Sequence, residues 1–153
     1  LAEQHVLLLG AGGAIRGVLG PLLAEHPAQV IIANRSADKA RDMALQYAGN
    51  GVPVFGCGLD ALHTDGPFDL LINGISAGLG GTMPDLPDGL LGANSRCYDM
   101  IYGSTPFLHW AEQGGCQARS DGLGMLIEQA AAAFACWHGW QPDTAPVIAA
   151  LRR

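Results

Sequence analysis

Two short segments of this chain have the residue types and the spacing to bind a dinucleotide. His5 and the apolar residues 6–9 run into the turn Gly10-Ala11-Gly12-Gly13-Ala14, and a second apolar run ends in Asn34-Arg35-Ser36. A buried strand that breaks into a glycine turn before a helix lets backbone N–H groups approach a pyrophosphate at the helix N-terminus. We therefore expect the turn over residues 10–14 to hold the pyrophosphate of a dinucleotide.

The end of the second apolar run indicates which dinucleotide is bound. Proteins that bind NAD usually carry Asp or Glu there, which accepts a hydrogen bond from the 2′-hydroxyl of the ribose. This chain has Asn34, Arg35 and Ser36 at that place. A carboxylate repels a 2′-phosphate and an arginine holds it, so the sequence predicts NADP. Ile15 replaces the third glycine of the usual G-x-G-x-x-G motif, so the glycine turn alone is a weak signal.

The distribution of charge supports an anionic ligand. The chain has 8 Lys and Arg against 14 Asp and Glu, a net charge of −6, yet Arg35, Lys39 and Arg41 fall within seven residues of one another. Such a local cluster in an acidic protein favours a small anion over nucleic acid, which needs a basic face. The alternative is that Lys39 and Arg41 belong to the solvated face of a helix.

Apolar runs alternate with helix-length segments along the chain. The expected strands cover residues 5–9, 29–33, 52–57, 68–73 and 96–101, with a shorter one at 116–119; the expected helices cover 14–25, 37–48, 87–91 and 105–113. This alternation is typical of a parallel sheet covered on both faces. We predict a three-layer α/β fold, a doubly wound sheet of the Rossmann type, with residues 1–153 in one domain.

Two further helical features are expected. Pro21 lies inside the first helix and lacks an N–H donor, so we expect a kink or a break there. Asp121 can cap a helix over residues 122–138, because an apolar stripe at helical spacing follows and Gly139 provides the stop. Gln129 lies beside this stripe, and its position alone favours a side chain in solvent.

The cysteines and the overall hydropathy favour a cytoplasmic protein. Cys57, Cys97, Cys116 and Cys136 are irregularly spaced and form no C-x-x-C pair, so we expect reduced, mostly buried thiols and no metal site. No apolar stretch approaches the roughly twenty residues of a membrane span, and no signal-peptide pattern is present. The chain lacks an initiating Met, which we interpret as part of a longer protein.

Five motifs, quoted in order, resemble those of the shikimate dehydrogenase family, and the resemblance extends from His5 to about Leu151. They are Gly10-Ala11-Gly12-Gly13-Ala14, Asn34-Arg35-Ser36, Tyr98-Asp99-Met100-Ile101-Tyr102, Thr105-Pro106-Phe107-Leu108, and Asp121-Gly122-Leu123-Gly124-Met125-Leu126 followed by Gln129-Ala130-Ala131. Five motifs in order are far more specific than a glycine turn. One departure is the run Asn73-Gly74-Ile75, where the family has Asn-Ala-Thr and a threonine hydroxyl is lost.

The resemblance implies NADP-dependent, reversible reduction of 3-dehydroshikimate to shikimate in aromatic amino-acid biosynthesis. It implies that the glycine turn holds the pyrophosphate and that residues 34–36 and Lys39 surround the 2′-phosphate. By the same resemblance, Met100 and Gly122 would border the nicotinamide. These assignments place the cofactor along the carboxyl ends of the strands, where ligands of such sheets bind.

The resemblance also places Tyr102 and Gln129 toward the substrate. A tyrosine and a glutamine can hydrogen-bond the hydroxyls and the carboxylate of a small polyol acid without adding charge. Without the family context, Tyr102 fits a partly buried aromatic side chain with its hydroxyl in water equally well.

In this family the catalytic Lys and its partner Asp belong to an N-terminal substrate domain. The single lysine of this chain is Lys39, which is assigned to the cofactor. A positioned acid that protonates the carbonyl as hydride arrives contributes about 10²–10⁴-fold to the rate. We therefore expect no catalytic residue in this chain, which would be the NADP-binding half of a two-domain enzyme and inactive alone. Its last helix, over residues 143–152, would be loosely held or would pair with a second copy, giving a homodimer.

Three alternatives remain open from the sequence. A methyltransferase that uses S-adenosylmethionine would also have a glycine turn, but it typically has an acid where Asn34 stands. A non-catalytic dinucleotide sensor would explain a cofactor site without a proton donor, although it leaves Tyr102 and Gln129 unexplained. A quinate-using or NAD-using paralogue is nearest, and Arg35 argues only against the use of NAD.

Overall fold

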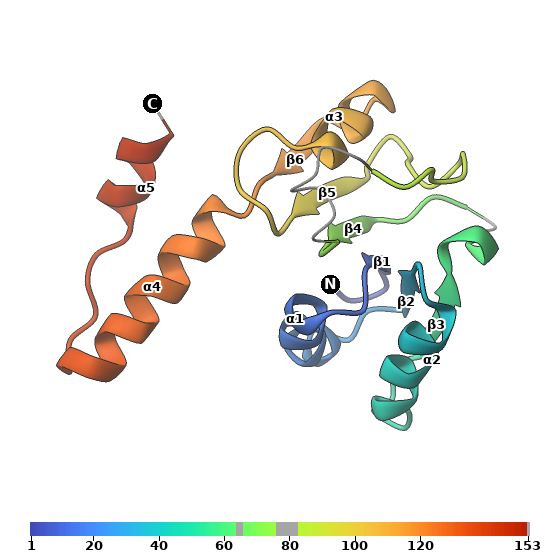
Figure 1. Ribbon diagram of the computed structural model, residues 1–153, viewed down its shortest axis with the longest axis horizontal. Helices are drawn as coiled ribbons and strands as arrows, with labels where there is room; N and C mark the ends of the chain where they lie inside the picture. Colours follow the sequence, from blue (N-terminus) through green and yellow to red (C-terminus); the bar gives the residue numbers. More distant parts are fainter. Residues whose placement is uncertain (64–65, 76–82, 153) are drawn as a thin grey trace.

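The computed structural model describes residues 1–63, 66–75 and 83–152. Their backbone forms a sheet with the strand order β3-β2-β1-β4-β5-β6 (Figure 1). The strands are β1 His5–Leu9, β2 Gln29–Asn34, β3 Val54–Gly58, β4 Leu70–Asn73, β5 Arg96–Asp99 and β6 Ala118–Ser120. All neighbouring pairs are parallel. The predicted doubly wound α/β fold is confirmed.

The sheet is covered on both faces because its central strands are apolar on both faces. In β1, Val6 and Leu8 belong to one core and Leu7 and Leu9 to the other, and all four are fully buried. The covering helices are α1 Gly13–Ala24 and α2 Ala37–Gln46 on the first core, and α3 Pro106–Gln113 on the second (Figure 1). A strand buried on both faces is a continuous apolar run in sequence, which is why β1 could be located.

The break considered at Pro21 does not occur, because α1 continues through this residue to Ala24. Pro21 lies in the last turn of the helix, where its missing N–H removes a single hydrogen bond. Leu19, Leu22 and Leu23 are buried against the sheet and hold the same turn in place. Packing therefore outweighs the local cost of the proline.

The predicted helix at residues 87–91 is wrong. Gly89 has a φ of +82°, a left-handed conformation that ends any right-handed helix. Leu90 is nevertheless buried in the second core, so its apolar character reflects burial of a loop. A short 3₁₀ helix, η1 Leu59–Ala61, follows β3 and had not been predicted.

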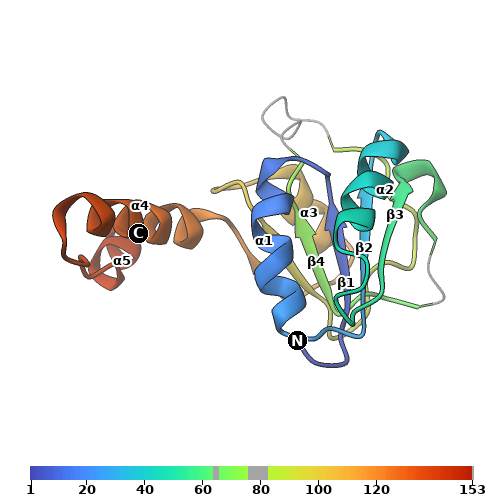
Figure 2. The ribbon, with the colours of Figure 1, turned by 90° about the horizontal axis from the view of Figure 1, so that it is seen from below.

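Two helices project from the body as an arm (Figure 2). They are α4 Leu123–His138 and α5 Ala145–Leu151, and α5 lies along α4 with Thr144 Oγ1 2.6 Å from Glu128 Oε1. Gly139 ends α4 as predicted, with a φ of +76°. At the other end Gly122 is the N-cap instead of Asp121, whose Oδ1 only accepts a 3.4 Å hydrogen bond from the Leu123 N–H.

The apolar stripe predicted for α4 is only partly buried. Ile127 and Ala131 are buried, whereas Leu126 is exposed and Trp137, near the end of the helix, is 80% exposed. Among the residues that the structure describes, no helix has the length and hydropathy needed to cross a lipid bilayer.

Candidate functional site

The site is built on the carboxyl edge of the sheet, where hydrogen bonds continue beyond the strands. The Gly10 N–H donates to Ala33 O at 2.8 Å, and the Gly74 N–H donates to Leu9 O at 2.8 Å. The Met100 N–H donates to Asn73 O at 2.9 Å, and the Gly122 N–H donates to Ile101 O at 3.0 Å. Five chain segments distant in sequence therefore lie side by side, which brings the predicted Gly10, Met100 and Gly122 to one edge.

The glycine turn leads from β1 to the N-terminus of α1. Gly10 has a φ of +105°, and a Cβ there would lie 3.1 Å from Gly74 O. Gly12 is the N-cap of α1 and offers no side chain to its first turn, and a Cβ on Gly12 or Gly13 would meet nothing within 4 Å. This helix end therefore carries no side chain on two successive residues and no side-chain cap, which leaves room for an anion near its first N–H groups.

A groove of about 470 Å³ runs from the glycine turn to the end of β2. Its lining includes seven of the predicted cofactor residues and five others. The lining residues are Gly10, Ala11, Gly12, Asn34, Arg35, Ser36, Lys39, Leu59, Gly74, Ile75, Met83 and Pro84. The structure thus brings the two predicted halves of the dinucleotide site together; Gly13 and Ala14 lie just beyond, in the first turn of α1.

The groove is positively charged. Arg35 and Lys39 line it, and neither has an ion pair or a side-chain hydrogen bond with any residue that the structure describes. The described lining contains no Asp or Glu. Arg41 is outside the groove and pairs with Asp38 at 3.2 Å, so the alternative of a solvated helix face applies to Arg41. Two free cations beside a glycine turn suit a phosphate group.

The ends of β4, β5 and β6 form a second surface beside the glycine turn. A Cβ on Gly122 would overlap the Met100 carbonyl, and a Cβ on Gly74 would lie 2.7 Å from Ile15 Cδ1 and 3.4 Å from Met100 Sδ. Both glycines therefore permit the close approach of neighbouring segments. This surface lies where the second half of a dinucleotide is bound in doubly wound sheets.

The two predicted substrate residues lie away from the groove. Tyr102 lies in the loop after β5 and is 62% exposed. It is therefore more exposed than the alternative interpretation, a partly buried aromatic side chain, would have it. The loop is held by Asp121, whose Oδ2 accepts a 2.7 Å hydrogen bond from the Gly103 N–H. Gln129 is exposed on α4, as its position relative to the apolar stripe indicated. Neither lines the groove, so their roles stay predictions.

None of the cysteines with a perturbed pKa is activated as a nucleophile. All four cysteines are free, with Cys97 and Cys116 buried and Cys136 exposed. Burial raises the pKa of the Cys97 thiol well above its ordinary value, and the neighbouring Cys116 raises it further. Burial likewise raises the pKa of the Cys57 thiol. Raised values disfavour the thiolate. No group of three potential metal ligands occurs in the described part of the chain.

Two family models match this chain. The shikimate / quinate 5-dehydrogenase model matches residues 1–72, and the shikimate 5′-dehydrogenase C-terminal domain model matches residues 122–152. The chain belongs to the shikimate dehydrogenase family. The two models cover the glycine turn, the residues at the end of β2 and the arm.

Individual curated proteins and solved structures are also similar to this chain. The chain is 59% identical to the shikimate dehydrogenase (NADP(+)) of Alcanivorax borkumensis, over 99% of this chain and 55% of that protein. The crystal structure of an Ael1 enzyme from Pseudomonas putida is 41% identical with a TM-score of 0.84, over 99% and 55% of the two chains. The ligand-free 5-ketofructose reductase of Gluconobacter sp. is 32% identical with a TM-score of 0.77, over 99% and 56%. The chain spans about half the length of the curated relatives it matches.

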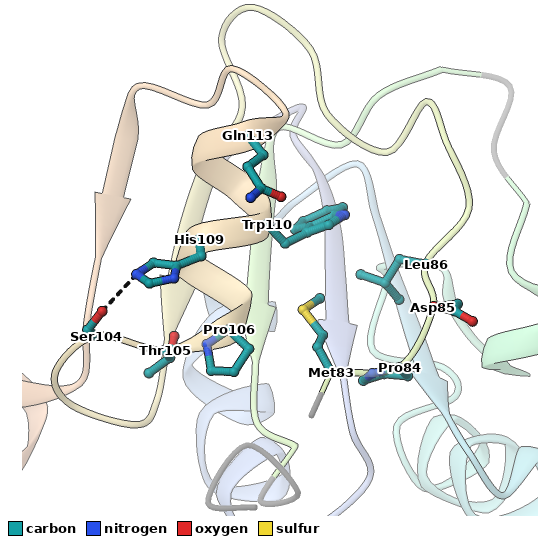
Figure 3. A pocket seen from close by; sticks show the side chains of 10 residues that line it. All are labelled: Met83, Pro84, Asp85, Leu86, Ser104, Thr105, Pro106, His109, Trp110 and Gln113. Carbon is teal, nitrogen blue, oxygen red and sulfur yellow. Dashed lines mark hydrogen bonds between the residues drawn. The ribbon is translucent and has the colours of Figure 1, made fainter. Parts of the chain in front are cut away.

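A second hollow, of about 770 Å³, lies next to the groove and shares Met83 and Pro84 with it (Figure 3). Ser104 Oγ lies 2.8 Å from His109 Nε2 in this hollow. No described carboxylate bonds to the other side of His109, so the pair lacks the group that orients a histidine base. The remaining lining residues are Asp85, Leu86, Thr105, Pro106, Trp110 and Gln113.

The sequence did not point to several residues that complete the groove. Leu59 follows β3 in η1, and Met83 and Pro84 come from the segment between β4 and β5. Gly74 and Ile75 attracted attention only as departures from the family motif. They lie beside the glycine turn because β4 is the neighbour of β1 in the sheet, and no local sequence pattern indicates that pairing.

Proposed function

We propose that this chain binds NADP(H) and forms the cofactor half of a two-domain shikimate dehydrogenase. The whole enzyme would reduce 3-dehydroshikimate to shikimate by hydride transfer, with NADPH supplying the hydride. The observation that carries the proposal is the groove beside the glycine turn: its described lining holds no acid, and Arg35 and Lys39 have no side-chain partner among the described residues. The name of the Alcanivorax borkumensis relative supports both the cofactor and the substrate.

The residues of this chain would divide the cofactor between them. The backbone of residues 10–14 would hold the pyrophosphate through the N–H groups at the start of α1. The side chains of Arg35 and Lys39, with residues 34 and 36, would bind the 2′-phosphate. The Asn34 side-chain amide donates to Ser36 O at 3.1 Å, and this hydrogen bond fixes the backbone turn that contains Arg35. Met100 and Gly122 would border the nicotinamide.

Most of the substrate-binding site and the proton donor would be provided by the part of the enzyme outside this chain. Lys39 is the single lysine in the sequence and lines the proposed phosphate site. The carbonyl oxygen needs a proton as hydride arrives, and we assign that step to a Lys with a partner Asp in the substrate domain. Tyr102 and Gln129 would contact the hydroxyls or the carboxylate of the substrate. Quinate is the alternative substrate.

The cofactor assignment predicts that NADP⁺ binds this chain more tightly than NAD⁺. The reason is electrostatic, since only NADP⁺ carries the 2′-phosphate that the two free cations can bind. Isothermal titration calorimetry with each dinucleotide measures the difference, which should shrink as salt is added. Tighter binding of NAD⁺, or binding of neither dinucleotide, contradicts the proposal.

The assignment of the chain as half an enzyme predicts that it does not turn over shikimate alone. With NADP⁺ and either shikimate or quinate, the absorbance of NADPH should stay flat, because the loss of a positioned acid alone costs about 10²–10⁴-fold. The same assay on a protein of the full length of its relatives, with the substrate domain included, should show turnover and should show whether shikimate or quinate is the better substrate. Substantial turnover by the 153-residue chain would show that a catalytic group within it has been overlooked.

A further inference from the structure

Asp99, the last residue of β5, is a buried carboxylate held entirely by neutral groups. The residue is 1% exposed. The Asn73 Nδ2 donates to both carboxylate oxygens at 3.2 Å, the Thr105 hydroxyl donates to Oδ2 at 2.6 Å, and the Ile101 N–H donates to Oδ1 at 3.0 Å. No Lys, Arg or His pairs with it among the described residues.

The donors to Asp99 are themselves fixed by other backbone groups. Asn73 and Thr105 are both buried. Asn73 Oδ1 accepts a 3.2 Å hydrogen bond from the Ile75 N–H, and Thr105 Oγ1 accepts one of 3.2 Å from the Leu108 N–H as the N-cap of α3. One carboxylate therefore ties together the segment after β4, the segment after β5 and the start of α3.

This network lies beneath the surface that the second half of a dinucleotide would use. Met100 stands between Asp99, which bears the carboxylate, and Ile101, whose N–H donates to that carboxylate. The Met100 carbonyl in turn sits where a Cβ on Gly122 would overlap it. The 2′-phosphate end of the site, at Arg35 and Lys39, shares none of these hydrogen bonds.

We propose that Asp99 is a positioning residue for the nicotinamide half of the cofactor: its buried carboxylate sets the strand ends on which that half lies. This inference rests on the proposed function, since it presumes a dinucleotide in the groove. Asp99 touches neither substrate nor cofactor and acts through Met100 and the segments after β4 and β5.

Asp99→Asn disturbs this network with almost no change of volume. Three donor groups converge on two carboxylate oxygens, whereas an asparagine offers one oxygen and adds two N–H donors of its own. Asn73 cannot compensate by flipping its amide, because its oxygen already serves the Ile75 N–H. At least one buried donor is left unsatisfied, and the strand ends should shift to relieve it.

The experiment compares two ligands on this chain by calorimetry. NADP⁺ probes the whole site, and adenosine 2′,5′-bisphosphate probes the phosphate end without a nicotinamide. Wild type should bind both. Asp99→Asn should bind NADP⁺ about 10-fold more weakly or worse, while its affinity for the bisphosphate changes by less than about 3-fold. Thr105→Val removes one donor to Asp99 and should also weaken NADP⁺ binding selectively, by a smaller factor. This variant provides the test if Asp99→Asn does not fold.

Ser95→Ala is the matched control. Ser95 is buried at the opposite end of β5, where its hydroxyl donates to Phe68 O at 2.6 Å and accepts from the Gly92 N–H at 2.8 Å. It should lower the melting temperature without changing the ratio of the two affinities. Equal losses for both ligands in the Asp99 and Thr105 variants, or no loss, overturn the positioning role. Failure of wild type to bind the bisphosphate would overturn the proposed function instead, and this inference with it.

Discussion

Replacing Arg35 by alanine is expected to remove the preference of this chain for NADP⁺ over NAD⁺. The guanidinium lines the groove without a partner among the described residues, so it is free to bind a 2′-phosphate. A charge-assisted hydrogen bond of this kind contributes about 2 kcal/mol, so NADP⁺ affinity should fall roughly thirtyfold while NAD⁺ affinity stays unchanged. Calorimetric titration of each dinucleotide measures both quantities.

Arg41→Ala is the control for this prediction. It removes the same charge from the same region, but Arg41 pairs with Asp38 at 3.2 Å and lies outside the groove. The NADP⁺ affinity of Arg41→Ala should therefore match that of wild type at physiological salt. If both variants weaken NADP⁺ equally, the effect reflects net charge, and the assignment of Arg35 to the 2′-phosphate is wrong. Arg35→Asp extends the test, because a carboxylate there should favour NAD⁺.

The core strands of this fold could be predicted because their burial leaves a local trace. After His5, β1 is apolar at every residue, and its observed bounds match the prediction. β5 was predicted to continue to residue 101 but ends at Asp99. Its carboxylate accepts the Ile101 N–H, which turns the chain away from the sheet. That event depends on donors 26 and 6 residues away in sequence, Asn73 and Thr105, which no local pattern reveals.

The site divides in the same way. The glycine turn and Arg35 follow directly on strands, so their meeting at one sheet edge could be predicted from the rule for parallel strands. Leu59 and Pro84 reach the groove through crossovers whose course the sequence does not encode locally. The apolar stripe of α4 predicted a helix correctly, but Trp137 and Leu126 are exposed. Amphipathicity indicates that a face is suited to burial, and it does not say what buries it.

Gly56→Ala is expected to destabilise the chain more than a methyl group usually does. Gly56 lies in β3 directly beneath α2, and a Cβ there would overlap the backbone carbonyl of Ala40 and crowd the Arg41 nitrogen. Backbone cannot rotate away as a side chain can, so the whole helix must move. We expect a loss of about 3 kcal/mol in the free energy of unfolding, measured by urea denaturation.

The same helix connects this loss of stability to the site. Lys39 lies in α2 and Arg35 lies just before this helix, so displacement of α2 from β3 shifts both cations. NADP⁺ should then raise the melting temperature of Gly56→Ala less than that of wild type. Gly17→Ala is the matched control: Gly17 is exposed inside α1 and a Cβ there meets nothing within 4 Å, so it should stabilise by about 0.5–1 kcal/mol. Equal stability of the two variants would mean that α2 does not rest on β3 as closely as the structure has it, and the placement of the phosphate-binding cations would fail with it.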